Sequence, residues 1–127
     1  MERLRQCGIQ PTPQRLAIAA FVLETSSHPT ADEVYSQVQP NCSTLSRATV
    51  YNTLHLMVER GILKAQRIQD EIVHFDANTE VHHHFVDEST GRIFDIPWNA
   101  LQLQGHQELE AFEVSEYQVI LRGRLKP

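Results

Sequence analysis

Histidine and aspartate residues are concentrated between residues 74 and 95 of this 127-residue chain. Consecutive histidines occupy positions 82–84, with Asp76 before them and Asp95 after them. If the histidine run is an extended strand, His82 and His84 point to one face and His83 points to the other. Two imidazoles and carboxylates on one face suit a divalent first-row metal such as Fe(II), Mn(II) or Zn(II). The alternative is a solvated, polar run of histidines that binds no metal.

The helices and strands that position these residues belong to a small chain of 14.6 kDa. Such a chain forms one compact unit, or two small lobes that need a partner to bury enough apolar surface. It has no apolar run of about eighteen residues and no basic and apolar leader, so we expect a cytoplasmic protein that neither spans a membrane nor is secreted. Its cysteines are Cys7 and Cys42, which form no CxxC pair. This pattern excludes a disulfide framework and is typical of a reducing cytosol.

The charges are distributed unevenly along the chain, whose net charge is −5. Residues 1–67 hold seven Lys and Arg against five Asp and Glu, whereas residues 68–127 hold four against eleven. A basic half joined to an acidic, histidine-rich half indicates one lobe that meets a polyanion and another that meets cations. A chance division of solvated charges would give the same numbers.

Capping signals predict two helices in the first forty residues. Thr12 is the N-cap of a helix over 13–23, which begins with proline and is apolar on nearly all sides. Thr30 and Glu33 form a capping box at the start of a second helix, which ends at about residue 39.

A third helix is predicted between Ser46, its N-cap, and Gly61, which follows its end. Apolar residues recur on one face at helical spacing: Val50, Leu54, Met57 and Val58. The first turns also offer small, polar and basic groups able to reach phosphates and base edges: Ser46, Arg47, Thr49, Tyr51 and Asn52.

Two short strands, over 62–65 and 72–75, then read as a hairpin. Helices followed by a two-stranded wing predict a winged helix-turn-helix, whose last helix enters the major groove of DNA. In the alternative interpretation, the helices form a plain core and Arg47 and Asn52 are surface residues.

The C-terminal part is expected to contain antiparallel strands over 82–87 and 92–96, joined by a turn that ends at Gly91. A weak pattern predicts a helix within 98–112, and a third strand is predicted over 114–121. Trp98 is expected to pack in a core or an interface.

The predicted class is therefore α+β, with a winged helix-turn-helix followed by a small α/β dimerisation domain with antiparallel strands. We assign residues 1–76 to the DNA-binding domain, 77–81 to a hinge and 82–127 to dimerisation and metal sensing. Because a lobe of this size has a thin core, we expect it to bury apolar surface against a second copy in a homodimer.

Several blocks, in order and at matching spacing, resemble the ferric uptake regulator family over nearly the whole chain. These blocks are 8–15 (GIQPTPQR), 28–35 (HPTADEVY), 46–54 (SRATVYNTL), 75–76 (FD) and 82–84 (HHH). The resemblance implies a dimeric, metal-responsive repressor that binds a palindromic operator in double-stranded promoter DNA, and no enzyme activity.

The resemblance also implies functional residues. The regulatory metal site of the family falls on His28, Asp76, His82, His84 and Asp95. Positions that match Tyr51 and Asn52 read DNA, and Arg15 matches a basic residue that faces the DNA backbone. The expected metal is Fe(II) or Mn(II), and Zn(II) could take the site in vitro.

Asp95 stands where iron sensors of the family usually carry glutamate, which resembles the peroxide-responsive branch. There Fe(II) reacts with hydrogen peroxide and a ligand imidazole is oxidised, and by resemblance the oxidised residues would be His28 and His82. An iron- or haem-responsive regulator of the same family is the alternative, because the triple histidine resembles that branch too.

One departure concerns the structural zinc that most members hold through two CxxC pairs. This chain has neither pair, so a structural four-cysteine zinc is predicted absent. Tyr117 stands where the additional metal site of the family has an imidazole, so that site is not expected. For His83 and His106 we expect a solvated surface position.

Two hypotheses lie outside the family. A small mononuclear metalloenzyme could use His82, His84 and a carboxylate as a facial triad, but the N-terminal helices would then have no role. A metal-storage or interaction module would bind no DNA.

Overall fold

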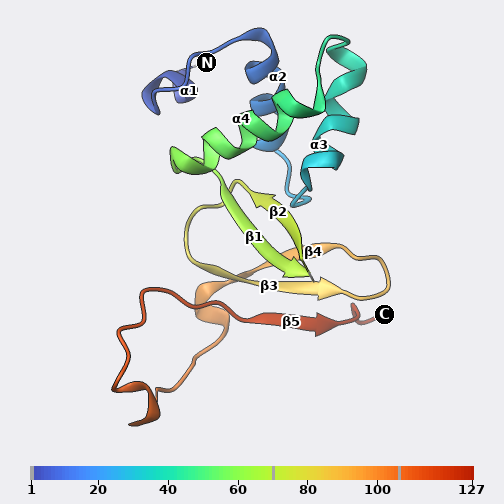
Figure 1. Ribbon diagram of the computed structural model, residues 1–127. Helices are drawn as coiled ribbons and strands as arrows, with labels where there is room; N and C mark the ends of the chain where they lie inside the picture. Colours follow the sequence, from blue (N-terminus) through green and yellow to red (C-terminus); the bar gives the residue numbers. More distant parts are fainter. Residues whose placement is uncertain (1, 70, 106) are drawn as a thin grey trace. The chain divides into compact units, whose positions relative to one another are not determined.

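Side-chain caps begin each of the longer helices in the computed structural model, which describes residues 2–69, 71–105 and 107–127. Thr12 accepts a hydrogen bond from Arg15 N at the start of α2 (Pro13–Val22). Thr30 and Glu33 form the predicted capping box at the start of α3 (Ala31–Val38). Ser46 caps α4 (Arg47–Glu59). These sequence predictions are confirmed, and Figure 1 shows the helices together with the short α1 (Glu2–Gln6), which the sequence did not predict.

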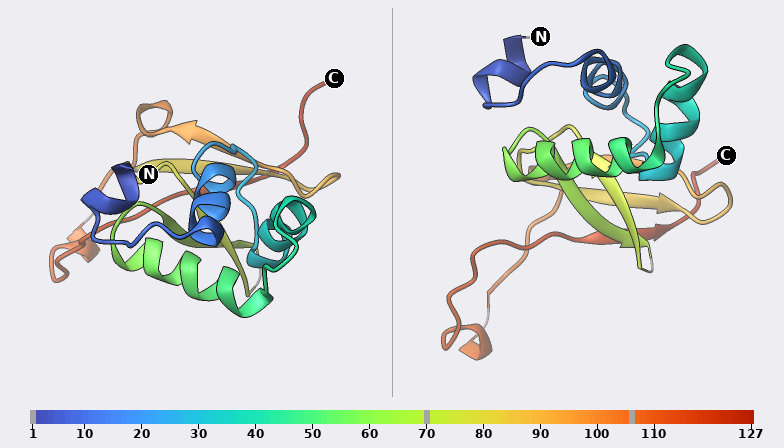
Figure 2. Two further views of the ribbon diagram at one scale, coloured as in Figure 1. Left: turned by 90° about the horizontal axis from the view of Figure 1, so that it is seen from above. Right: turned by 45° about the horizontal axis from the view of Figure 1, so that its top comes forward.

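The contacts of the chain divide it into two units, Met1–Thr79 and Glu80–Pro127, and each is described here by itself. The N-terminal unit has a helical core, and the two views of Figure 2 show α2, α3 and α4 packed against one another. The most buried core side chains come from every one of these helices: Ile18, Val22, Val34, Val50, Leu54 and Met57. The predicted apolar face of α4 thus lies in the core, which leaves its opposite face exposed.

A hairpin of β1 (Lys64–Gln69) and β2 (Ile72–Asp76) completes the N-terminal unit, with Ala65 opposite Phe75. β1 starts two residues later than predicted, because residues 62 and 63 are buried in the helical core. Gly61 has a φ of +79°, and the next amide, Ile62 N, bonds the carbonyl of Met57 at 3.1 Å. This left-handed turn satisfies the last carbonyls of α4 and directs the chain into the hairpin.

The C-terminal unit contains a sheet in the order β4-β3-β5, formed by β3 (His82–Asp87), β4 (Ile93–Pro97) and β5 (Ile120–Gly123). β3 and β4 are antiparallel, as predicted, and His84 lies opposite Asp95. β5 pairs with β3 in parallel. The long crossover over 98–119 makes a parallel neighbour possible.

The sequence prediction was wrong about this crossover. Within the described parts of 98–119 the helices are two short 3-10 turns, Trp98–Ala100 and Gln107–Leu109, and the last strand begins only at Ile120. Leu103, Leu109 and Phe112 are 49 to 66 % exposed. These side chains remain largely in solvent, and a helix of this length without packing on one face is marginal in water.

The predicted α+β class is confirmed, with helices first and strands after them. None of the helices in the described ranges has the length and apolar character that crossing a membrane requires.

Candidate functional site

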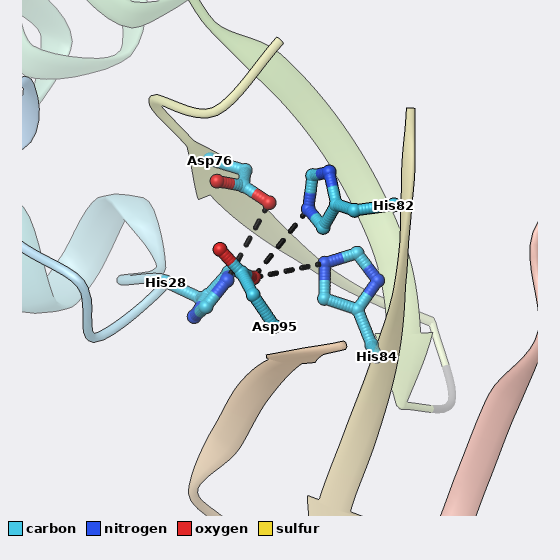
Figure 3. Close-up of side chains that lie close together, drawn as sticks. All are labelled: His28, Asp76, His82, His84 and Asp95. Atoms are coloured by element: carbon cyan, nitrogen blue, oxygen red, sulfur yellow. Dashed lines mark ion pairs between the residues drawn. The ribbon is translucent and has the colours of Figure 1, made fainter. Parts of the chain in front are cut away.

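In the C-terminal unit, His82, His84 and Asp95 converge on one face of the sheet (Figure 3). Asp95 Oδ1 lies 3.4 Å from His82 Nε2 and 3.6 Å from His84 Nε2. One ligand atom from each of the three residues lies within 4.8 Å of the others. The alternation of β3 and the cross-strand register with β4 produce this group, as the sequence predicted for the two histidines.

Hydrogen bonds fix which ring nitrogen of each histidine faces the carboxylate. His82 Nδ1 lies 2.6 Å from the carbonyl oxygen of Glu80, and His84 Nδ1 lies 2.9 Å from Oε1 of Gln118. Both partners are acceptors, so each Nδ1 carries the hydrogen and donates it. In the neutral rings the Nε2 lone pairs are therefore directed towards Asp95, as metal-binding imidazoles require.

In the N-terminal unit, His28 and Asp76 form a second pair of buried donors, with His28 Nε2 3.4 Å from Asp76 Oδ2. His28 follows α2, and Asp76 ends β2, so residues far apart in the sequence meet here. Asp76 Oδ1 also accepts a hydrogen bond from Asn78 N at 2.9 Å, which orients the carboxylate. Figure 3 shows both side chains.

The backbone of His28 is strained. Its φ is +54°, in the left-handed region, and it precedes Pro29, which further restricts its conformation. Such a conformation costs on the order of 1 kcal/mol for a residue with a side chain, and strain of this kind is concentrated at functional sites. The strained backbone therefore marks His28 as a candidate functional residue.

The donor sets of both units fit a divalent transition metal. They consist of imidazole nitrogens and carboxylate oxygens without any thiolate, which suits Fe(II), Mn(II) or Zn(II). His28, His82 and His84 are each at least 93 % buried, so these donor atoms are largely removed from solvent.

The residues predicted to meet DNA lie in the N-terminal unit. Arg47, Tyr51 and Asn52 are exposed on α4. Ser46 and Thr49 share the capping hydrogen bonds of that helix, and their hydroxyls lie 2.9 Å apart.

Two of the exposed side chains on α4 contact the preceding helix. Arg47 Nη1 lies 2.8 Å from Asp32 Oδ1, and the guanidinium lies 4.5 Å from the ring centre of Tyr35. The hydroxyl of Tyr51 donates to the same Asp32 oxygen at 3.4 Å. Arg15, at the start of α2, is half-buried and donates to the carbonyl of Gln10. The sequence did not predict the role of Asp32, which lies fifteen residues from Arg47.

The surface position expected for His83 is wrong. His83 is only 1 % exposed, and its ring stacks on Trp98 with centroids 4.6 Å apart. Its Nδ1 accepts a hydrogen bond from Val119 N at 2.8 Å. The crossover segment covers the face of β3 that carries His83. The alternation of residues along the strand gives no sign of this cover. His106 lies outside the described residues.

A carboxylate organises the turn between β3 and β4. Asp87 accepts hydrogen bonds from Ser89 N at 3.0 Å, Ser89 Oγ at 2.7 Å and Thr90 Oγ1 at 2.9 Å. The bonds from Ser89, followed by that from Thr90, lower the pKa of Asp87 from its ordinary value of 3.8.

We expect Asp87→Asn to lower the thermal midpoint of unfolding at pH 7, because the amide replaces a carboxylate that accepts several hydrogen bonds. Since the folded pKa is depressed, this stabilisation is complete above 3.8, the ordinary pKa of the group, and is lost as the pH falls through the lower folded value. Thermal unfolding followed by circular dichroism between pH 7 and acid measures the difference. The neighbouring exposed carboxylate serves as the control, and equal effects of Glu88→Gln would contradict the role of Asp87.

Comparisons with known proteins agree with one another. The chain matches the sequence model of the Ferric uptake regulator family over residues 6–122. It is 36% identical over 125 residues to the peroxide-responsive repressor PerR of Staphylococcus aureus, covering 97% of this chain and 84% of the relative. Among solved structures, PerR from Streptococcus pyogenes is 30% identical with a TM-score of 0.56, covering 98% of this chain and 86% of that one. The ferric uptake regulator of Francisella tularensis with iron is 25% identical with a TM-score of 0.75, covering 94% and 93%.

These matches decide between the classes of protein that the sequence left open. The family consists of metal-responsive transcriptional regulators that bind DNA as dimers, and its members are not enzymes. The prediction of a metal-responsive regulator is confirmed, and the metalloenzyme and storage-module hypotheses are not supported. By the length of the match and by the fold of both units, this chain is a member of the ferric uptake regulator family.

Proposed function

We propose that this protein is a DNA-binding repressor controlled by one regulatory metal ion, held by His28, Asp76, His82, His84 and Asp95. The observation that carries the proposal is the division of the donors between the two units. His28 and Asp76 belong to Met1–Thr79, whereas His82, His84 and Asp95 belong to Glu80–Pro127. An ion that takes ligands from both units couples them, so its binding changes how the DNA-binding unit is presented.

The proposal assigns residues 1–76 to DNA binding, 77–81 to a hinge and 82–127 to dimerisation and metal sensing. In a homodimer, the two α4 helices would reach the two halves of a palindromic operator in double-stranded promoter DNA. The exposed residues Arg47, Tyr51 and Asn52 support this role for α4, and Arg15, Ser46 and Thr49 complete the proposed DNA-binding set. With roughly four to six cations per protomer facing phosphate, DNA binding should be moderate and depend on salt.

We further propose that the effector is hydrogen peroxide and that the metal in the cell is Fe(II), with Mn(II) as a non-reactive substitute. Support comes from the relatives named peroxide-responsive repressors and from Asp95 in the ligand set. The net reaction would transfer one oxygen atom of hydrogen peroxide to a ring carbon and release the other as water, with the imidazole losing the two electrons that the peroxide gains. Fe(II) held by these residues would supply the redox activation of the peroxide beside the rings. His28 and His82 are the rings we expect to receive the oxygen atom. An iron- or haem-responsive regulator is the alternative.

One experiment tests both levels of the proposal. Wild-type protein with Mn(II) selects its duplex from a random DNA library, and fluorescence anisotropy then follows binding with Mn(II) or Fe(II). We expect binding with either metal. Trace peroxide should release the Fe(II) form and add one oxygen atom to His28 or His82, as mass spectrometry detects, while the Mn(II) form stays bound.

The possible failures are distinct. Unmodified histidines after Fe(II) and peroxide would argue against peroxide sensing and favour the iron- or haem-responsive regulator. Binding to DNA that is the same with and without metal would reject metal control itself.

A further inference from the structure

His74, like His83, is a histidine of the 74–95 segment that the proposed metal site does not use. It lies in β2, two residues before Asp76, so both side chains leave the strand on the same face. Its Nδ1 lies 2.7 Å from the backbone carbonyl oxygen of His28, which is 46 positions away in the sequence. A carbonyl oxygen only accepts, so the ring must donate its Nδ1 hydrogen to His28.

This hydrogen bond is the one polar contact of the His74 side chain within the described residues. Its other nitrogen, Nε2, is buried and has no hydrogen-bond partner in that part of the chain. Leaving a buried nitrogen without a partner is unfavourable, and an apolar residue at this position would avoid it. The donation to His28 is therefore the contact that accounts for a histidine here.

The residue that receives the bond is the strained one. His28 has a φ of +54° and precedes Pro29. The amide of Phe75, next to His74, donates to the carbonyl of Pro29 at 2.9 Å. Two adjacent residues of β2 thus bind two adjacent carbonyls. The side chain of His74 binds the carbonyl of His28, and the backbone amide of Phe75 binds that of Pro29.

Fixing the carbonyl of His28 also fixes the direction of its imidazole. The ring places Nε2 3.4 Å from Asp76 Oδ2, on the same strand that holds the backbone. If the segment relaxed to an ordinary negative φ, the side chain would leave the backbone in another direction. Partners of this kind, which orient a metal ligand without touching the metal, change metal affinity by about 10–100-fold.

We propose that His74 is a positioning residue, whose Nδ1 hydrogen bond to the His28 carbonyl holds the left-handed backbone that turns the His28 imidazole towards Asp76. The inference rests on the proposed function in taking His28 as a metal ligand. The structural half of the proposal, that His74 maintains the backbone of His28, can be tested without metal.

The test compares two amides at position 74. In His74→Asn the amide nitrogen takes approximately the place of Nδ1 and can still donate to His28, whereas in His74→Gln the longer chain carries its amide beyond that place. In metal-free protein, the backbone chemical shifts of His28 should stay near wild type in His74→Asn. They should move towards values of an ordinary negative φ in His74→Gln.

The same variants are then titrated with Co(II), whose visible absorption reports its ligands. We expect His74→Gln to bind Co(II) about 10–100-fold more weakly than wild type, and His74→Asn to recover most of that loss. In a His28→Ala background, His74→Gln should cause no further loss, because the effect passes through His28.

Each failure has its own meaning. If wild type binds no Co(II), the proposed metal site fails, but the metal-free shifts still judge His74. Wild-type shifts and affinity in His74→Gln would overturn the positioning role and leave the metal site intact. A loss of equal size in the His28→Ala background would also overturn it.

Discussion

Replacing His82 with alanine should weaken Mn(II) binding by about a hundredfold or more and abolish metal-dependent binding to the selected DNA duplex. His82 Nε2 lies 3.4 Å from Asp95 Oδ1, and the Glu80 carbonyl already fixes its ring. Loss of an outer-shell partner alone costs about 10–100-fold in metal affinity, so loss of a ligand should cost at least as much. Isothermal titration with Mn(II) and fluorescence anisotropy with labelled duplex measure the two effects.

A conservative variant separates the loss of a ligand from damage to the fold. Asp95→Asn keeps the size of the side chain and should act in the same direction as His82→Ala. The matched control is Glu116→Gln, which makes the same change of charge at an exposed position and should leave both affinities unchanged. Wild-type metal and DNA binding in His82→Ala, with a wild-type circular dichroism spectrum, would show that the site is wrongly assigned.

Replacing Arg47 with alanine should weaken binding to the selected duplex by about 10–100-fold, the effect of losing one good contact to a base edge or phosphate. Arg47 is exposed in the first turn of α4, yet it is restrained by Asp32 at 2.8 Å and by the ring of Tyr35 at 4.5 Å. A guanidinium held in place loses less conformational freedom when it meets DNA. Anisotropy titrations at several salt concentrations measure the affinity and its salt dependence.

The salt dependence tells which DNA group Arg47 contacts. If it contacts phosphate, the slope of log affinity against log salt should fall by about one per protomer, with an equal loss on all sequences. If it reads a base, discrimination against altered duplexes should fall instead. Arg124→Ala removes the same charge at an exposed position of the C-terminal unit and should have little effect. Equal losses in the two variants would mean that overall charge, rather than α4, governs binding.

Metal control of this kind has a reciprocal consequence. If the metal raises DNA affinity, bound DNA must raise metal affinity by the same factor. The donors of the two units therefore act as one regulatory site only if metal raises the affinity for DNA and DNA raises the affinity for metal.

Much of the fold could be predicted from short-range signals in the sequence. Thr12, Thr30 with Glu33, and Ser46 act on amides three residues away, so the same few residues encode and form each cap. Gly61 ends α4 for an equally local reason. Strand alternation likewise placed His82 and His84 on one face. The helix caps, the end of α4 and this alternation could all be predicted without knowledge of distant residues.

The C-terminal crossover was decided by tertiary structure. Its residues were predicted to form a helix and a strand that begins at 114, but β5 begins at Ile120 and pairs in parallel with β3. His83 was expected in solvent, yet the crossover brings Trp98 and Val119 against it. Neither outcome has a local signal, because each depends on which distant segment covers the sheet.

The sequence by itself determined which side chains could bind a metal, since residue type and spacing are local properties. Only the tertiary structure decided how those side chains are held. The ring nitrogens of His82 and His84 face Asp95 because Glu80 and Gln118 accept hydrogen bonds from their other nitrogens, and His28 is held by His74 from 46 positions away. An imidazole is oriented by whatever lies against its second nitrogen, and for His84 a segment distant in the chain supplies that neighbour, whereas His28 is held through its backbone carbonyl.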